Sequence, residues 1–190
     1  MNISDIQAAL KEEGLDGWLF FDHHHRDPIA YRVLQFTPGS SVTRRWYYYI
    51  PAEGEPVGLA HKIEPDTLGP LPGKITHYAG WKDMVGGLQE MLEGAGKIAM
   101  QFSPNCAVPY VAMVDAGTVD LVRQLGVTVA TSANLIQQFE SRWTEQQREN
   151  HFAAGKLVDQ VRTEAFGLIS EKQRLGDRIT EFEVKQFIQQ

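Results

Sequence analysis

The chain has 190 residues, enough for one ordinary domain with a substantial extension but cramped for two full domains. It is 43% hydrophobic and 22% charged, a composition typical of globular proteins and unlike that of disordered chains. The net charge of −6 argues against a nucleic-acid partner, because phosphate binding needs an excess of cations. A spanning helix needs about 20 mostly apolar residues, and no such run occurs, so we expect no membrane partner.

The first residues and the cysteine content bear on the compartment. No basic segment followed by an apolar segment opens the chain, so we expect no secretory signal and a cytoplasmic location. Cys106 is the single cysteine, which rules out an internal disulfide and a zinc cluster built on cysteines. It has no cationic neighbour in the sequence that would lower its pKa, so we expect a buried, inert thiol.

Short strands and helices alternate along residues 1–139. One helix is expected from a capping box at 4–7 to Gly14, and a second from the N-cap Asp27 to Pro38 and Gly39. Further helices are predicted at 81–92, 118–125 and 132–139, and strands at 16–22, 44–50, 57–60, 74–79, 97–101 and 127–130. The strands at 44–50 and 57–60 form a predicted hairpin. The pattern therefore predicts an α/β fold, a three-layer mixed sheet with helices on both faces.

Two helices are predicted after residue 140. The first spans 144–173 and ends before Gly176, and a capping box at 180–183 starts the second. Apolar residues recur at helical spacing along the first of them, namely at Ala154, Leu157, Val158, Val161, Ala165, Leu168 and Ile169. Isolated helices are marginal in water, so this stripe must be covered by its own domain, by another chain or by further sequence. The second helix lacks a C-cap, and we expect the natural chain to continue past Gln190.

The most reactive-looking segment runs from Asp22 to Asp27 and contains His23, His24, His25 and Arg26. It lies where a strand passes into a helix, the position at which α/β proteins carry functional loops. Imidazole and carboxylate groups are metal ligands and proton carriers, but three adjacent loop residues rarely converge on one ion. Two interpretations stay open: a loop that contacts a ligand or a neighbouring subunit, and a solvated loop whose aspartate is only an N-cap.

An aromatic and basic strand follows this loop. Because side chains alternate along a strand, Trp46 and Tyr48 should share one face, with Arg45, Tyr47 and Tyr49 on the other. We prefer this two-sided strand, with tyrosine hydroxyls at its rim, to an aromatic-basic binding strip. No phosphate-binding, dinucleotide-binding, zinc-protease or serine-hydrolase motif occurs, so the residues predict no catalytic site, no metal ligands and no complete enzyme.

Four segments in order carry a resemblance to a known family. They are 15–20 after an opening helix, the strand at 97–101, Leu135 and Ile136 shortly before Arg142, and 176–184. The last resembles the Gly-x-x-x-Thr-Glu-x-Glu helix start of the catalytic domain in the creatinase, prolidase and aminopeptidase P family, dinuclear metallohydrolases with a pita-bread fold. Where relatives often show Arg-x-x-Lys-x-x-x-Glu, this chain reads Arg-Trp-Thr-Glu-Gln at 142–146, which leaves the substrate subclass open.

The resemblance implies that residues 1–139 form a creatinase/prolidase-like N-terminal domain. Residues 140–190 would then be the first helices of a truncated pita-bread α+β catalytic domain. The family's metal ligands, two Asp, one His and two Glu, match no residue here. The resemblance implies that a full-length parent would hold two divalent ions (Mn, Co or Zn) and cleave peptides of the Xaa-Pro type. This chain alone would be inactive.

In the family, the N-terminal domain helps to build the dimer or tetramer and covers the active site of a neighbouring subunit. The resemblance therefore implies a homo-oligomer, a dimer, with a peptide as substrate of the full-length protein. The residues that would gate the substrate are His23, His24, His25, Arg26, Asp27 and Trp46. The alternative is a stand-alone binding or scaffold domain without catalytic activity.

Overall fold

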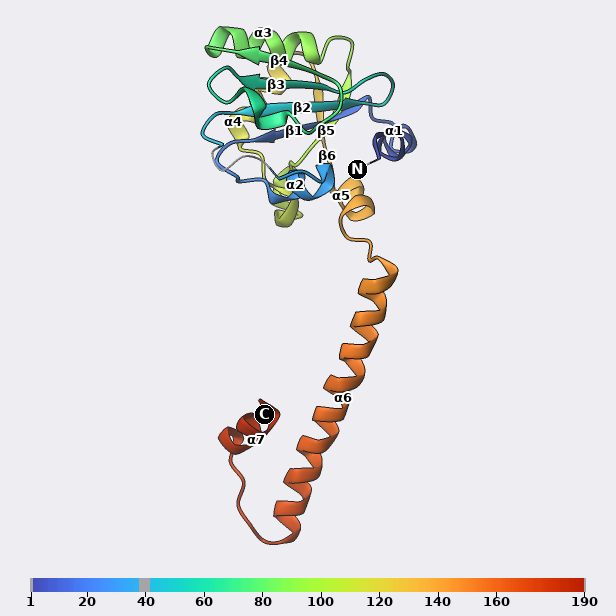
Figure 1. Ribbon diagram of the computed structural model, residues 1–190, viewed down its shortest axis with the longest axis vertical. Coiled ribbons are helices and arrows are strands. Elements are labelled where there is room, and N and C mark those ends of the chain that lie inside the picture. Colours follow the sequence, from blue (N-terminus) through green and yellow to red (C-terminus); the bar gives the residue numbers. More distant parts are fainter. Residues whose placement is uncertain (1, 38–41, 190) are drawn as a thin grey trace. The chain divides into compact units, whose positions relative to one another are not determined.

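The computed structural model describes residues 2–37 and 42–189 of the chain. Clustering of its contacts divides the chain into two compact units, Met1–Arg142 and Trp143–Gln190. The first unit contains all the described strands and the second consists of helices (Figure 1). The two units are described separately below.

The first unit is built on one six-stranded sheet. Its strands are β1 (Gly17–Asp22), β2 (Trp46–Pro51), β3 (Val57–His61), β4 (Lys74–Tyr78), β5 (Lys97–Met100) and β6 (Thr128–Thr131). They are ordered β4-β3-β2-β1-β5-β6. Strand β2 runs antiparallel to both neighbours and the remaining pairs are parallel, which confirms the predicted hairpin and mixed sheet. The carboxyl ends of five strands therefore meet at one edge, together with the amino end of β2.

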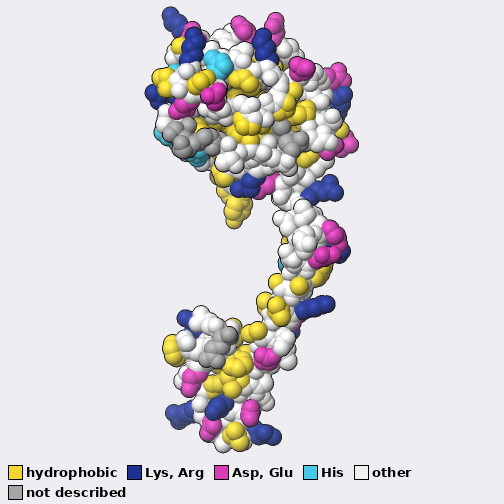
Figure 2. All heavy atoms as spheres, in the orientation of Figure 1, with side chains coloured by type: hydrophobic (Ala, Val, Ile, Leu, Met, Phe, Trp, Pro, Cys, Tyr) yellow, Lys and Arg dark blue, Asp and Glu magenta, His cyan; other side chains and the backbone are white. Residues whose placement is uncertain are grey.

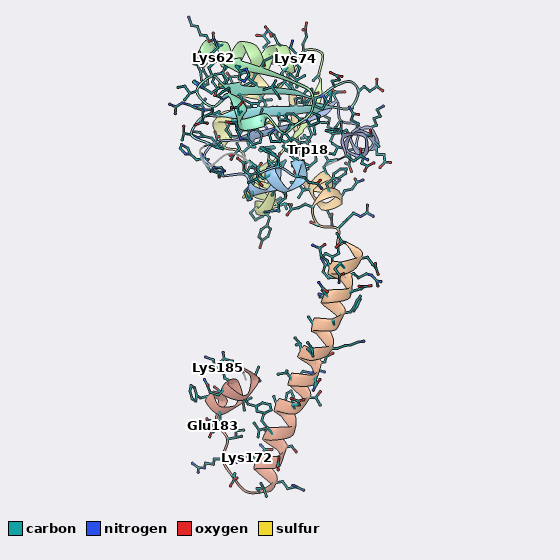
Figure 3. All side chains as sticks on the ribbon, in the orientation of Figure 1. Trp18, Lys62, Lys74, Lys172, Glu183 and Lys185 are labelled. Carbon is teal, nitrogen blue, oxygen red and sulfur yellow. The ribbon has the colours of Figure 1, made fainter. Side chains whose placement is uncertain are left out.

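Helices cover both faces of this sheet, as predicted. Residues of α1 (Ile3–Glu12), α2 (Pro28–Leu34) and α5 (Ala133–Phe139) pack on one face, and residues of α3 (Trp81–Met91) and α4 (Ala116–Gln124) pack on the other. Short 3-10 helices occur at Pro65–Leu68, Pro104–Cys106 and Pro109–Val111. Trp18 illustrates the packing: its indole nitrogen donates to Gln101 Oε1 at 3.2 Å, and its ring lies 6.4 Å from that of Phe139 on α5 (Figure 3).

Side chains of β2 alternate between the two cores. Trp46 and Tyr48 pack with α1, α2 and α5, whereas Tyr47 and Tyr49 pack with α3 and α4. Each buried aromatic contributes about 1.5–3 kcal/mol through the hydrophobic effect. The hydroxyls of Tyr48 and Tyr49 donate to the carbonyl oxygens of Pro72 and Asp16, at 2.7 and 3.0 Å. This confirms the prediction of a two-sided strand.

The start of the first helix differs from the sequence prediction. The N-cap of α1 is Asn2, whose side chain accepts from the backbone N–H of Ser4 at 3.1 Å. The predicted capping box needs Gln7 to reach back to the helix start. Instead, the Gln7 amide donates to the carbonyl oxygens of Pro51 and Gly54 at 3.0 and 2.8 Å, so tertiary contacts displace the local motif.

The end of α2 also differs from its prediction. The helix stops at Leu34, and Gln35 follows in the left-handed conformation with φ 53°. Its cap N–H bonds the carbonyl oxygens of Arg32 and Tyr31, which closes the last turn. Pro38 and Gly39, the predicted stop, lie outside the described residues.

The second unit consists of two helices, α6 (Glu145–Arg174) and α7 (Glu181–Ile188). Thr144 and Gln147 form the predicted capping box of α6, and Gly176 ends the segment at φ 76°. Thr180 caps α7 through a second capping box with Glu183. Figure 3 labels Lys172 near the end of α6 and Glu183 on α7. The structure thus confirms the long helix, the short helix that follows and the capping box of each. The prediction that the second helix lacks a C-cap is wrong, because Gln189 caps α7 and its N–H bonds the carbonyl oxygens of Lys185 and Phe187.

Across the described part of the chain, no helix combines the length and the apolar character needed to span a membrane.

Candidate functional site

The loop after β1 carries the predicted site residues. His24 and His25 both adopt the left-handed conformation, with φ 64° and 54°. The His24 N–H donates to the Val42 carbonyl oxygen at 3.0 Å, which ties the loop to the segment that precedes β2. The side chains of His24, His25 and Arg26 are exposed, so the loop presents imidazole and guanidinium groups at the carboxyl edge of the sheet.

Asp22 holds this loop in place. Its carboxylate accepts from the backbone N–H groups of His25, Arg26 and Asp27, at 3.0, 2.7 and 2.9 Å. The hydroxyl of Tyr31 on α2 donates to the same carboxylate. Burial raises the pKa of Tyr31, so the phenol keeps its proton and acts as the donor. A buried carboxylate with four donors is a rigid anchor, because each donor would lose a partner if it moved.

Asp27 begins α2 from within the core. Its Oδ1 accepts from the Ala30 N–H at 3.0 Å, as the predicted N-cap. The residue is only 1% exposed, and its Oδ2 has no hydrogen-bond partner among the described residues. Burial, with the nearby charge of Asp22, raises the pKa of Asp27 to about 7. Asp27 therefore faces α2 and the core, while the three histidines and Arg26 form the outer wall.

The imidazoles do not assemble a metal site. The His23 and His24 rings meet edge to face at a centroid distance of 4.2 Å, and His25 lies beside Tyr31. Within the parts of the chain that the structure describes, no three His, Cys, Asp or Glu side chains are placed to hold one ion. Burial lowers the pKa of His23, and the charges of His24, Arg45 and Arg26 lower it further. The loop therefore carries neutral and cationic donors suited to contact with a ligand.

Trp46 lies beneath the loop and not at its surface. It is fully buried, opposite Asp22 in the β1–β2 register, and its ring packs edge-on against Tyr31 and Phe36. Its indole nitrogen has no hydrogen-bond partner in the described structure. In this conformation Trp46 supports the loop through Tyr31, and it offers no surface for a substrate.

Two residues behave differently from the sequence analysis. Asp22 was included in the reactive-looking segment without a role of its own, and it organises the whole loop by accepting from backbone N–H groups that follow it, as Asp side chains do in turns. Cys106 was predicted to be buried, and this is wrong, because its side chain is exposed. Asn105 and Cys106 both take positive φ, 53° and 54°, in a surface 3-10 turn after Pro104.

No known protein-family model matches the sequence. No curated protein matches it either. Solved structures do match, and they define the fold.

The mixed sheet with helices on both faces is the fold of the creatinase/prolidase N-terminal domain. That domain of an X-Pro dipeptidase from Streptococcus pyogenes matches with a TM-score of 0.52 and 13% identity, over 72% of this chain and 96% of that chain. A prolidase from Pyrococcus horikoshii OT3 matches with a TM-score of 0.53 and 13% identity, over 98% of this chain and 48% of that chain. A dipeptidase from the same organism matches with a TM-score of 0.59 and 18% identity, over 88% and 44%. The chain thus spans about half the length of these full-length enzymes.

Proposed function

We propose that this chain is the N-terminal, non-catalytic portion of a Xaa-Pro dipeptidase-like or aminopeptidase P-like metallohydrolase. The observation that carries the proposal is the extent of the structural likeness. It covers nearly all of an isolated creatinase/prolidase N-terminal domain, and with a prolidase it extends over 98% of this chain. The second unit is therefore included, where the sequence resembles the family's first catalytic helices.

The surface of the second unit supports the proposal. Helices α6 and α7 line an apolar groove of about 590 Å³, and apolar side chains gather there in Figure 2. Leu157, Val158 and Phe166 on its wall are 63%, 67% and 67% exposed. Contiguous exposed apolar surface of this kind marks an interface. In the proposed parent this groove packs against the remainder of the catalytic domain.

The residues of this chain do not fit the two-metal centre that the family implies. No suitable cluster of three ligating side chains occurs in residues 2–37 and 42–189. In the proposed parent, two divalent ions (Mn, Co or Zn) would be held by residues outside these 190. We therefore assign the catalytic chemistry to the rest of the parent, and we expect the 190-residue chain to hydrolyse no Xaa-Pro dipeptide.

The histidine loop, residues 23–27, would serve the parent by shaping the substrate pocket of a neighbouring subunit. Its anchor on Asp22 holds His24 and His25 outward in a fixed conformation, as a pocket wall requires. Replacing both by Ala in the full-length protein should lower kcat/KM by about 10- to 100-fold, to different extents for different substrates, with metal content unchanged. A variant whose kcat/KM equals that of the wild type on every substrate would contradict this role. Loss of bound metal would assign the imidazoles to the metal centre.

The reading frame after the codon for Gln190 decides between this proposal and a stand-alone binding or scaffold domain. A continuing frame that encodes two Asp, one His and two Glu as ligands, and a product that cleaves Xaa-Pro dipeptides with Mn, Co or Zn, would support the proposal. A stop codon at that point would contradict it. Elemental analysis of the dialysed 190-residue chain is a second test, since two stoichiometric ions would place the metal centre here.

A further inference from the structure

A cavity of about 340 Å³ opens at the carboxyl edge of the sheet, next to the histidine loop. Figure 3 marks this edge with Lys62, the residue after β3, whereas Lys74 marks the opposite edge. Because β2 runs against β1 and β3, its amino end reaches the same edge as their carboxyl ends. Residues from four segments thereby form one wall: His23, Arg44, Arg45, His61 and Trp81.

Arg45 is the most unusual of these residues. Its side chain is half-buried, and its guanidinium lies 5.4 Å from the centroid of the Trp81 ring. Its guanidinium contacts Met84 Sδ at 3.8 Å, and its side chain also hydrogen-bonds the Tyr47 side chain. A thioether is a weak acceptor, and a guanidinium has five N–H donors. A charge partly removed from water is normally paired, so Arg45 has donors left over at the cavity wall.

The carboxylates close to this wall are already engaged. Glu64 accepts from the backbone N–H groups of Thr43 and Arg44, at 2.9 and 3.1 Å, and from the Thr43 hydroxyl. Asp83 accepts from the N–H of Gly80 at 3.3 Å, at the start of α3. No carboxylate among the described residues lies within ion-pair distance of Arg44 or Arg45. Burial raises the pKa of the nearby Glu64, but its hydrogen bonds and the charge of Arg44 outweigh this and lower the pKa below its usual range.

The imidazoles of the wall are polar groups that add to the two cationic arginines. The two ring nitrogens of His61 contact the Ala79 carbonyl oxygen and the Ile63 N–H, both at 3.0 Å, so both polar atoms of this ring are already engaged. His23 is pushed toward its neutral form by burial and by the positive charge of Arg45. The two arginines therefore supply the charge, and the imidazoles supply polar walls.

We propose that this cavity binds a small oxyanion, the carboxylate or phosphate group of a small molecule, with Arg45 as its principal contact and Arg44 as a second cation. A guanidinium fork matches the two oxygens of either group and binds them bidentately. The stack on Trp81 holds the fork in one orientation. The site lies within the first unit, so it does not depend on the proposed function.

The test is an NMR titration of the 190-residue chain with inorganic phosphate and, separately, with succinate, at constant ionic strength in chloride. We expect saturable shifts confined to backbone amides around the cavity, such as those of Arg45, Ala79 and Trp81. Saturation by phosphate alone identifies a phosphoryl ligand, and saturation by succinate alone identifies a carboxylate. Either result supports the site; no saturable shift with either anion overturns it.

Two variants that each remove one positive charge distinguish binding in the cavity from a general attraction of the anion to cationic side chains. Arg45→Gln should weaken binding at least about tenfold, because it removes the bidentate contact. Arg123→Gln is the control: this arginine also stacks on an aromatic ring, 4.9 Å from the centroid of Phe102, and it lies outside the cavity wall. Equal weakening by both variants would overturn the proposal. If Arg45→Gln does not fold, Arg44→Gln, an exposed position, should still weaken binding several-fold, and an unchanged affinity would count against the site.

Discussion

One carboxylate determines the conformation of the histidine loop. A left-handed backbone costs about 1 kcal/mol or more for a residue with a side chain, and His24 and His25 both adopt it. The compensation comes from Asp22, which accepts from three successive backbone N–H groups and from Tyr31. The loop is therefore a strained segment whose strain is offset by one buried anchor.

Removing this anchor should cost more than removing any one of its donors. Asp22→Ala leaves three backbone N–H groups and a hydroxyl without an acceptor, and we expect the free energy of unfolding to fall by on the order of 3 kcal/mol. Tyr31→Phe removes one donor and should cost about 1 kcal/mol. Urea unfolding measures both. A loss for Asp22→Ala no larger than that for Tyr31→Phe would show that the loop does not depend on the carboxylate.

Asp27 should make stability depend on pH. Its folded pKa of about 7 lies above the ordinary value of 3.8, so the folded state holds a proton that the unfolded state releases. Its contribution is fully present below about pH 4 and is lost as the pH rises through 7. Asn at this position keeps the oxygen that accepts from Ala30 and cannot ionise. The free energy of unfolding of Asp27→Asn, measured in urea relative to that of the wild type, should therefore rise by on the order of 3–4 kcal/mol between pH 4 and pH 8.

The N-cap of α4 provides a control of opposite sign for that experiment. Partial burial raises the pKa of Asp115, but hydrogen bonds from Thr118 outweigh it and hold the pKa below its usual range. Its stabilising effect is present above the unfolded pKa and is lost as the pH falls through the folded one. Asp115→Asn should thus lose stability relative to the wild type as the pH rises. The same trend in both variants would contradict the assigned role of Asp27.

At the scale of elements, the sequence predicted most of what the structure contains. Aromatic and β-branched runs bounded by Gly and Pro located the strands, because burial on both faces leaves a continuous apolar signal. Helix ends were predicted well where the cap is local, as at Thr144 and Asp27, and poorly where a distant group competes for it. At α1 the carbonyl oxygens of Pro51 and Gly54 take the Gln7 amide, and no pattern within residues 4–7 reports that contact.

The site was harder to predict for the same reason. Its residues were recognised by type, but the convergence of Asp22 with the N–H groups of His25 and Arg26 depends on backbone conformation, which the side chains alone do not specify. The cavity beside Arg45 depends on the antiparallel direction of β2. Sequence patterns indicate that a strand exists, and the sheet order decides which strand ends meet.

Two adjacent glycines in α3 test how tightly this helix packs on the sheet. A Cβ at Gly86 would meet no atom within 4 Å, whereas a Cβ at Gly87 would lie 2.9 Å from Leu59 Cδ1 in the core. Gly86→Ala should stabilise the protein by about 1 kcal/mol through helix propensity. Gly87→Ala has the same propensity gain but overpacks the core, which costs about 1–3 kcal/mol. The midpoint temperature of thermal unfolding should be clearly higher for Gly86→Ala than for Gly87→Ala. Equal midpoints would mean that α3 can shift away from β3.

At the scale of the whole molecule, the two units differ in how far they bury their apolar side chains. The first buries apolar side chains on both faces of its sheet, in two separate cores. In the second, Ala165 is the one buried residue of α6 among those described, and no described residue of α7 is buried. Two contacting helices cannot enclose a core, because each presents only one apolar stripe to the other.

The 190-residue chain should therefore self-associate through the groove between α6 and α7. Two copies that bury Val158, Phe166 and their neighbours remove apolar surface from water, which stabilises a dimer by about 25 cal/mol per Å² before the entropy cost of association. Sedimentation equilibrium at micromolar concentration should show a species larger than a monomer.

Val158→Glu should weaken this association at least about tenfold, because dimerisation would then bury an unpaired carboxylate. Gln160→Glu adds the same charge at an exposed position of α6 that does not line the groove, and it should leave the association nearly unchanged. A wild-type monomer throughout would show that the exposed stripe alone does not drive association. Equal weakening by the two variants would assign the association to net charge and not to the groove.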